Sequence, residues 1–218
     1  DIASSSITAR AGNAITSTSG SSMVTNGDIT LTAYDISLQD TAETYGTTVP
    51  VRSNPDITIT GSVITNGGTF SATTTAGGFS NDSINTGSGN VIINAASANL
   101  GNITTTGTGS LSVISTNGVI TQSTSSSQNL AISGTSLFSA SGGAITLQNT
   151  SNNLQGAVTL TTTGGDATLV NDAPTTTLGP VNVVGNLSVN AHNNLTLSSD
   201  ITTSGVTLLN FGNTSASI

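Results

Sequence analysis

Residues 109–123 read GSLSVISTNGVITQS, and residues 185–199 read GNLSVNAHNNLTLSS. The two phrases share a glycine, an LSV run, an asparagine and a closing serine at the same spacing. In LSV the apolar residues alternate with a small polar one, which is the period of a β-strand with one buried face. A phrase repeated in this way predicts stacked structural repeats.

The same alternation recurs along the whole chain, with Gly or Asn between the runs. Runs that begin at residues 91, 111 and 130 are about 20 residues apart, which is the length of one coil of a solenoid. The clearest examples are ITL at 29–31, ITI at 57–59, VII at 91–93, LSV at 111–113, LAI at 130–132, ITL at 145–147, VTL at 158–160, LSV at 187–189 and LTL at 195–197.

Two arrangements of such short strands compete. Antiparallel hairpins are possible locally, because NG at 26–27, 66–67 and 117–118 suits a tight turn. Parallel stacking explains more, because it places like residues above one another in successive coils. We therefore predict one all-β domain over residues 1–218, a parallel β-helix with coils of roughly 20 residues.

The composition agrees with a solenoid and excludes several classes of function. Charged residues make up only 6% of the 218 positions, aromatic residues 3%, and cysteine is absent. A chain without cysteine forms no disulfide and no thiolate metal site. The net charge of −8, with Arg10 and Arg52 as the only cations, argues against nucleic-acid partners. No apolar run reaches the length of a membrane helix, so we expect no membrane insertion.

Residues 39–55, QDTAETYGTTVPVRSNP, break the pattern and predict a loop excursion from the rod. The simpler interpretation is that this loop covers a strand edge or a coil face. The alternative is a recognition loop that uses Tyr45 and Arg52, because insertions in solenoids often gather on the binding face.

Residues 57–96 and 111–189 resemble the repeats of filamentous-haemagglutinin-like exoproteins, and the resemblance covers most of residues 28–210. It implies a right-handed parallel β-helix, export by the two-partner route of Gram-negative bacteria and a role in adhesion at the cell surface. The family's secretion domain carries Asn-Pro-Asn motifs, whereas this chain has only NPD at 54–56. The secretion route is therefore implied by the repeats alone.

No constellation of residues predicts an enzyme, a cofactor or a metal. A lone His192 cannot build a catalytic triad or a metal site without partners. Asp166 and Asp172 lack neighbouring cations and the nine-residue period of calcium-binding repeats. We expect all three residues to lie in turns or at the surface.

We therefore expect a structural extracellular protein, the β-helical shaft of a bacterial surface adhesin or filament. Neither end shows a cap, so the rod either continues into a longer chain or pairs end to end with another copy. Ile2, Phe211 and Ile218 are the candidate end-to-end contacts. A further alternative is a module that binds host or surface glycans, or ice through outward Thr-x-Thr pairs.

Overall fold

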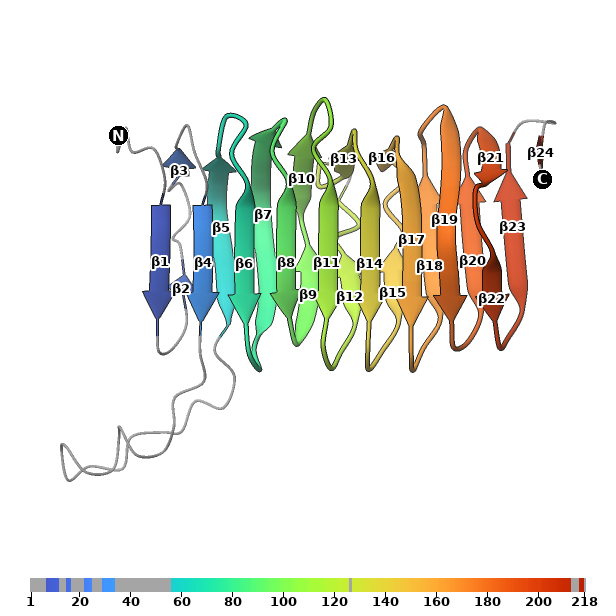
Figure 1. Ribbon diagram of the computed structural model, residues 1–218, viewed down its shortest axis with the longest axis horizontal. Coiled ribbons are helices and arrows are strands. Elements are labelled where there is room, and N and C mark those ends of the chain that lie inside the picture. Colours follow the sequence, from blue (N-terminus) through green and yellow to red (C-terminus); the bar gives the residue numbers. More distant parts are fainter. Residues whose placement is uncertain are drawn as a thin grey trace, which may run out of the picture.

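The structure is a computed structural model in which every pair of neighbouring strands is parallel (Figure 1). It describes residues 56–125 and 127–212, and the backbone of strands at 7–11, 15–16, 22–24, 29–33 and 216–217. The described residues contain no helix, so none could span a membrane. The prediction of an all-β parallel solenoid is confirmed, with coils roughly 21 residues apart.

An 11-stranded sheet forms one wall of the rod and faces the viewer in Figure 1, where its strands point downward; we call it the front sheet. Its strands are β1 (Ile7–Ala11), β4 (Ile29–Ala33), β6 (Phe70–Thr74), β8 (Val91–Ala95), β11 (Leu111–Ser115), β14 (Ser136–Ala140), β17 (Ala157–Thr162), β19 (Thr175–Val183), β21 (Asn194–Leu197), β22 (Ile201–Thr203) and β24 (Ala216–Ser217).

A 13-stranded back sheet forms the opposite wall, and it has two arms. The main arm continues through most coils, whereas the side arm ends at β16. β7 joins the arms, because Gly78–Ser80 pair with β9 and Ser83–Asn85 pair with β10. The strands are β2 (Ile15–Thr16), β3 (Ser22–Val24), β5 (Ile57–Ile64), β7 (Gly78–Gly87), β9 (Ser97–Leu100), β10 (Asn102–Thr105), β12 (Ile120–Gln122), β13 (Leu130–Ile132), β15 (Ile145–Leu147), β16 (Asn153–Leu154), β18 (Ala167–Asn171), β20 (Leu187–Ala191) and β23 (Thr207–Phe211).

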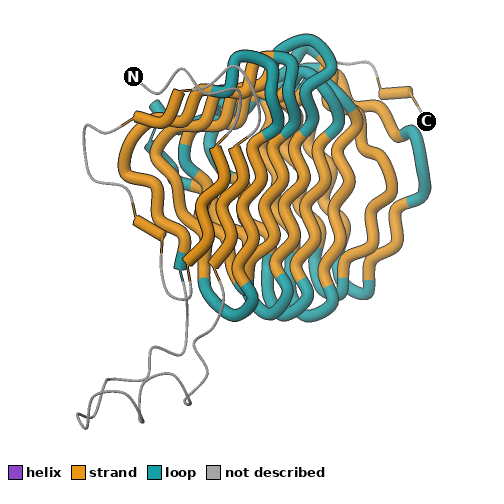
Figure 2. Tube along the Cα trace, turned by 60° about the vertical axis from the view of Figure 1, so that its left-hand side comes forward, coloured by secondary structure: helices purple, strands orange, loops and turns teal. Residues whose placement is uncertain are grey.

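The coil is right-handed, as the resemblance to the exoproteins implies. In Figure 1 the front strands descend and strands of the back sheet ascend behind them while the chain advances to the right. Figure 2 shows the coils in register, with the turns between strands aligned along the rod. Right-handed crossovers are the usual result for parallel strands that twist to the right.

The core is a stack of aliphatic side chains between the two walls. In β11 the buried residues are Leu111, Val113 and Ser115, and they alternate with partly exposed ones. Leu111 lies on Val91, which lies on Phe70, and all three are at most 1% exposed. Because each coil contributes only a few such residues, apolar burial grows coil by coil instead of around one centre.

Buried threonines close several of the turns. The Oγ1 hydroxyl of Thr86 donates to the carbonyl oxygen of Gly89 at 2.7 Å, and Thr162 does the same to Gly165 at 2.6 Å. Thr105 donates to the carbonyl oxygen of Gly109 at 2.7 Å. These bonds give the turn carbonyls a donor, although the Gly109 carbonyl also accepts from the Gly134 N–H at 2.8 Å, and glycine lets the coils approach closely there.

Two details of the predicted stacking are wrong. Leu111 pairs with Ser136 in the next coil, whereas Leu130 pairs with Ile103 in the back sheet. The two LSV phrases also lie on opposite walls, because β11 belongs to the front sheet and β20 to the back sheet. Both walls need the same alternation of apolar and polar residues, so the phrase specifies a strand and not the wall that contains it.

The predicted excursion at 39–55 lies outside the residues that the structure describes. That the full chain forms one domain stays a prediction.

Candidate functional site

The outer surface of the back sheet carries a continuous column of small polar side chains. Each member lies beside its neighbour in the adjacent coil, in the register of the parallel strands. The column consists of Thr58, Ser80, Asn99, Thr121, Thr146, Thr168 and Ser188. It ends at Leu208, which is 59% exposed.

Two depressions meet at the start of this column and form what we call the polar groove. One has a volume of about 490 Å³ and is lined by residues that include Asp56, Gly78 and Asn117. The other has a volume of about 170 Å³ and is lined by residues that include Asp82 and Asn99. Thr58 and Ser80 line both depressions. The polar groove therefore crosses the coils of β5, β7 and β9 and reaches the turn before β12 at Asn117.

Backbone irregularities shape the groove where the two arms of the back sheet diverge. The pairing of β5 with β7 shifts register between Ile59 and Ser62, which is a bulge. In the next coil the chain bends at Gly101, between β9 and β10. The buried side chain of Asn81 supports this bend, because its Oδ1 accepts from the Gly101 N–H at 3.2 Å and its Nδ2 donates to the Asn102 carbonyl at 3.1 Å. Bulges often redirect side chains at binding sites.

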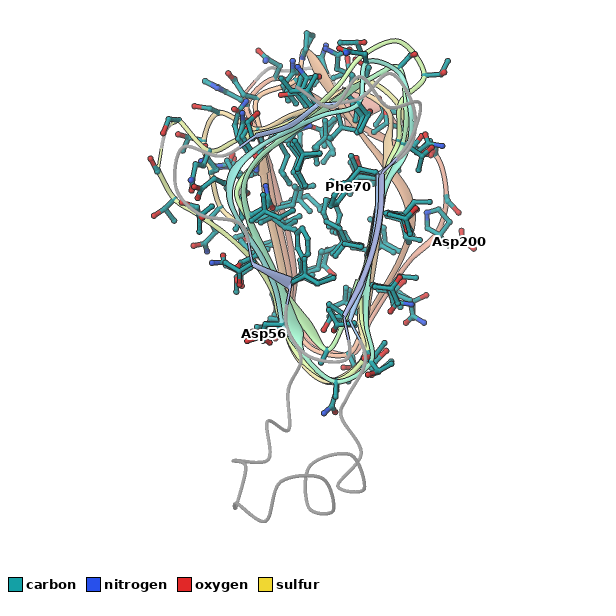
Figure 3. All side chains as sticks on the ribbon, turned by 90° about the vertical axis from the view of Figure 1, so that its left-hand side faces the viewer. Asp56, Phe70 and Asp200 are labelled. Carbon is teal, nitrogen blue, oxygen red and sulfur yellow. The ribbon has the colours of Figure 1, made fainter. Side chains whose placement is uncertain are left out.

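Among the described residues that line the groove, most are polar and the charged ones are all negative. Asp56, labelled in Figure 3, accepts a hydrogen bond from the Gly78 N–H at 2.7 Å, which fixes its carboxylate. Asp82 is exposed, and its carboxylate forms no hydrogen bond or ion pair with the described residues. The hydroxyl of Ser80 donates to that of Thr58 at 3.4 Å, and Thr121 donates to Asn99 Oδ1 at 3.3 Å. Each of these groups keeps hydrogen-bonding capacity toward solvent.

The residues considered for catalysis lie in turns far along the rod from the groove. His192 Nδ1 contacts Asp172 Oδ1 one coil earlier, and both side chains are largely exposed. Asp166 Oδ1 accepts from the Asn186 N–H at 2.7 Å, again one coil apart. The sequence did not predict these contacts between coils. Within the described ranges, no group of three His, Cys, Asp or Glu side chains is placed to hold a metal ion.

Of the residues predicted for recognition and end contacts, only Phe211 lies within the described part. It ends β23 and packs, partly buried, against the core together with Leu197, Ile201 and Leu209. Tyr45, Arg52, Ile2 and Ile218 lie outside the described residues, so the structure brings none of them to a site.

The polar groove was not predicted from the sequence, although part of its signal was present. The central residues of three of the strand triplets are members of the outer column: Thr58 in ITI at 57–59, Thr146 in ITL at 145–147 and Ser188 in LSV at 187–189. What the triplets do not show is the bulge and the bend that hollow the surface there.

Comparison with known proteins gives one match. A family model described as repeats of unknown function (DUF5649) matches residues 88–161, a span that includes β8, β11 and β14. No curated protein and no solved structure matches the chain. Over its middle coils this chain is therefore similar to a family of repeat proteins.

Proposed function

We propose that this chain is a structural segment without catalytic activity, the rigid shaft of a secreted bacterial adhesin or surface filament. One observation carries the proposal: from β6 to β23 each coil pairs in parallel with the next on both walls. In such a stack every coil is held by hydrogen bonds to two neighbours, so stiffness extends along the whole length. A rod of this kind can hold a binding tip away from a cell.

The composition of the outer wall supports an extracellular rod. Its exposed column presents hydroxyl and amide groups instead of the charged side chains usual on soluble proteins. Small polar residues can repeat from coil to coil without stacking like charges about 4.8 Å apart. The resemblance to filamentous-haemagglutinin-like exoproteins supports the same place in the cell.

Immunogold labelling of intact cells of the source bacterium tests this location. Antibodies raised against the 218-residue chain are expected to label the exterior of cells that have not been permeabilised. An antibody to a cytosolic protein serves as the control for intact envelopes. Labelling that requires permeabilisation would contradict a surface shaft.

A second candidate, a protomer that stacks head to tail into a filament, is favoured by the exposed end of the back sheet. β23 pairs with β20 on one side, and no described strand pairs with its other side. Val206 and Leu208 are 70% and 59% exposed in this last coil. An unpaired strand edge with apolar neighbours is a template for strand addition.

Replacing Thr207 with proline is expected to shorten or abolish such filaments. The N–H of Leu187 donates to the Val206 carbonyl in the following coil at 2.9 Å. Thr207 pairs with Leu187 in register, so its own N–H faces the open edge, where proline would remove a donor without breaking a backbone hydrogen bond inside the rod. Proline also removes the exposed hydrogen bond between the hydroxyls of Thr203 and Thr207, at 2.9 Å. Electron microscopy of the full chain measures filament length, with Thr168→Val as the control. Filaments of unchanged length would rule out strand addition at β23.

A further inference from the structure

We propose that the polar groove binds a neutral, unbranched polysaccharide chain that lies across the coils. The site consists of Thr58, Ser80 and Asn99 at its floor, with Asp82 beside them. This inference goes beyond a purely mechanical role, and it does not depend on where the rod is located in the cell.

The shape of the groove suits an extended chain. It crosses the coils of β5, β7 and β9, which are spaced about 4.8 Å apart. This spacing is comparable with the advance of one pyranose ring along an extended glycan. Successive sugar units can therefore meet successive members of the polar column in equivalent positions.

The chemistry of the lining suits vicinal hydroxyl groups. Each hydroxyl of Thr58 and Ser80 can donate one hydrogen bond and accept others, and the amide of Asn99 can do both. The Asp82 carboxylate has no partner among the described residues, so within the described part its two oxygens can accept from a pair of sugar hydroxyls. A carboxylate beside hydroxyl and amide groups offers the acceptors and donors that a neutral sugar needs.

The charge of the groove decides between neutral and acidic glycans. Asp56 and Asp82 are negative, and the described residues that line the groove include no Lys, Arg or His. An anionic glycan or a phosphate would face repulsion here without a compensating cation. The structure therefore favours a neutral ligand over a sulfated or uronic acid chain.

The two aspartates are too far apart to act together on a glycosidic bond. Asp56 lies opposite Gly78 of the next coil in the register of the strands. Gly78 lies four residues before Asp82 along β7, so the backbone positions of the two aspartates are separated by four residues of strand. At about 3.3 Å per residue this separation exceeds the distance between the carboxylates of both hydrolytic mechanisms. We therefore infer binding without cleavage.

Isothermal titration calorimetry of the full chain with neutral hexasaccharides tests the proposal. Cellohexaose, maltohexaose and mannohexaose are the probes, and a heparin hexasaccharide is the anionic control. At least one neutral probe is expected to bind, and Asp82→Ala or Ser80→Val is expected to raise its Kd at least tenfold. Thr168→Val, in the same column but remote from the groove, is expected to leave the Kd unchanged, and circular dichroism verifies that each variant folds.

Three outcomes would overturn the inference. They are no binding of any neutral probe at millimolar concentration, binding of the heparin hexasaccharide alone, and equal weakening by Thr168→Val and Ser80→Val. The last result would mean that the whole wall contacts the sugar and the groove is not a site. Calorimetry does not depend on where the protein is located in the cell. Absence of sugar binding would therefore contradict the groove proposal and not the shaft proposal, and absence of surface labelling would contradict the shaft proposal and not the groove proposal.

Discussion

Replacing Gly101 with alanine is expected to destabilise the rod by about 3 kcal/mol or more, because the new methyl group has no space. A Cβ atom at this position would lie 2.0 Å from the carbonyl oxygen of Asn81 and 2.7 Å from that of Asp82. Both contacts are with the backbone of the preceding coil, so no side-chain rotation can relieve them. The two coils would have to separate at the corner between β9 and β10.

Urea denaturation monitored by circular dichroism measures this effect, and Gly164→Ala is the matched control. Gly164 lies in an exposed turn, where a Cβ would come no closer than 3.6 Å to the Gly142 carbonyl carbon. The control is therefore expected to stay within about 0.5 kcal/mol of the unchanged protein. Equal midpoints for the two variants would show that the coils are not closely packed at Gly101.

The strand triplets predicted most of the fold because period-two alternation is a local property. ITI at 57–59 begins β5 and LSV at 111–113 begins β11, with the outer residues of each triplet buried. Assignment of a strand to a wall depends on how many residues the intervening turn contains. The polar segment 123–129 adds residues to one coil. Leu111 therefore pairs in register with Ser136 of the next coil and not with Leu130, which pairs with Ile103. Nothing in the composition of that segment distinguishes an insertion from an ordinary turn.

The candidate site was less predictable because it arises between coils. Thr58 and Ser80 are ordinary outward residues of their own strands, and only their stacking makes a column. The depth of the groove comes from the bulge in β5 and the bend at Gly101, which depend on packing against neighbouring coils. For the same reason the contact between Asp172 and His192 was not foreseen from residues that stand far apart in the sequence.

Buried asparagines are the clearest case of residues whose role the sequence concealed. Asn149, Asn152 and Asn171 are at most 2% exposed, although asparagine is a residue type typical of surface turns. Asn149 Nδ2 donates to the carbonyl oxygens of Ser125 and Gln128, at 2.7 and 2.9 Å, and so holds the inserted segment. Their amides satisfy backbone groups near the end of the side arm, where the regular ladder stops at β16.

Asn152→Ala is expected to lower the free energy of unfolding by about 4 kcal/mol, because several buried partners lose their hydrogen bonds together. Asn152 Oδ1 accepts from the Leu130 N–H at 2.9 Å and from Gln122 Nε2 at 2.6 Å. Its Nδ2 donates to Gln122 Oε1 at 2.9 Å and to the Val170 carbonyl at 3.2 Å. Alanine would remove all four of these bonds and leave the Leu130 N–H and Gln122 Oε1 without the amide that pairs with them, whereas Gln122 Nε2 keeps a longer bond to the Gln128 carbonyl at 3.4 Å. Water cannot replace the lost amide without opening the coil.

The neighbouring Asn153→Ala is the control, because the two positions differ in bonding and not in residue type. The buried Oδ1 of Asn153 has no hydrogen-bond partner among the described residues, so removing it breaks no bond of that atom there. We expect this variant to keep the original stability within about 1 kcal/mol. Urea midpoints compare the two, and hydrogen exchange of the Leu130 amide reports the lost bond directly. If Asn152→Ala left that exchange rate unchanged, the asparagine could not be the acceptor that secures β13, and the side arm would depend on strand pairing alone.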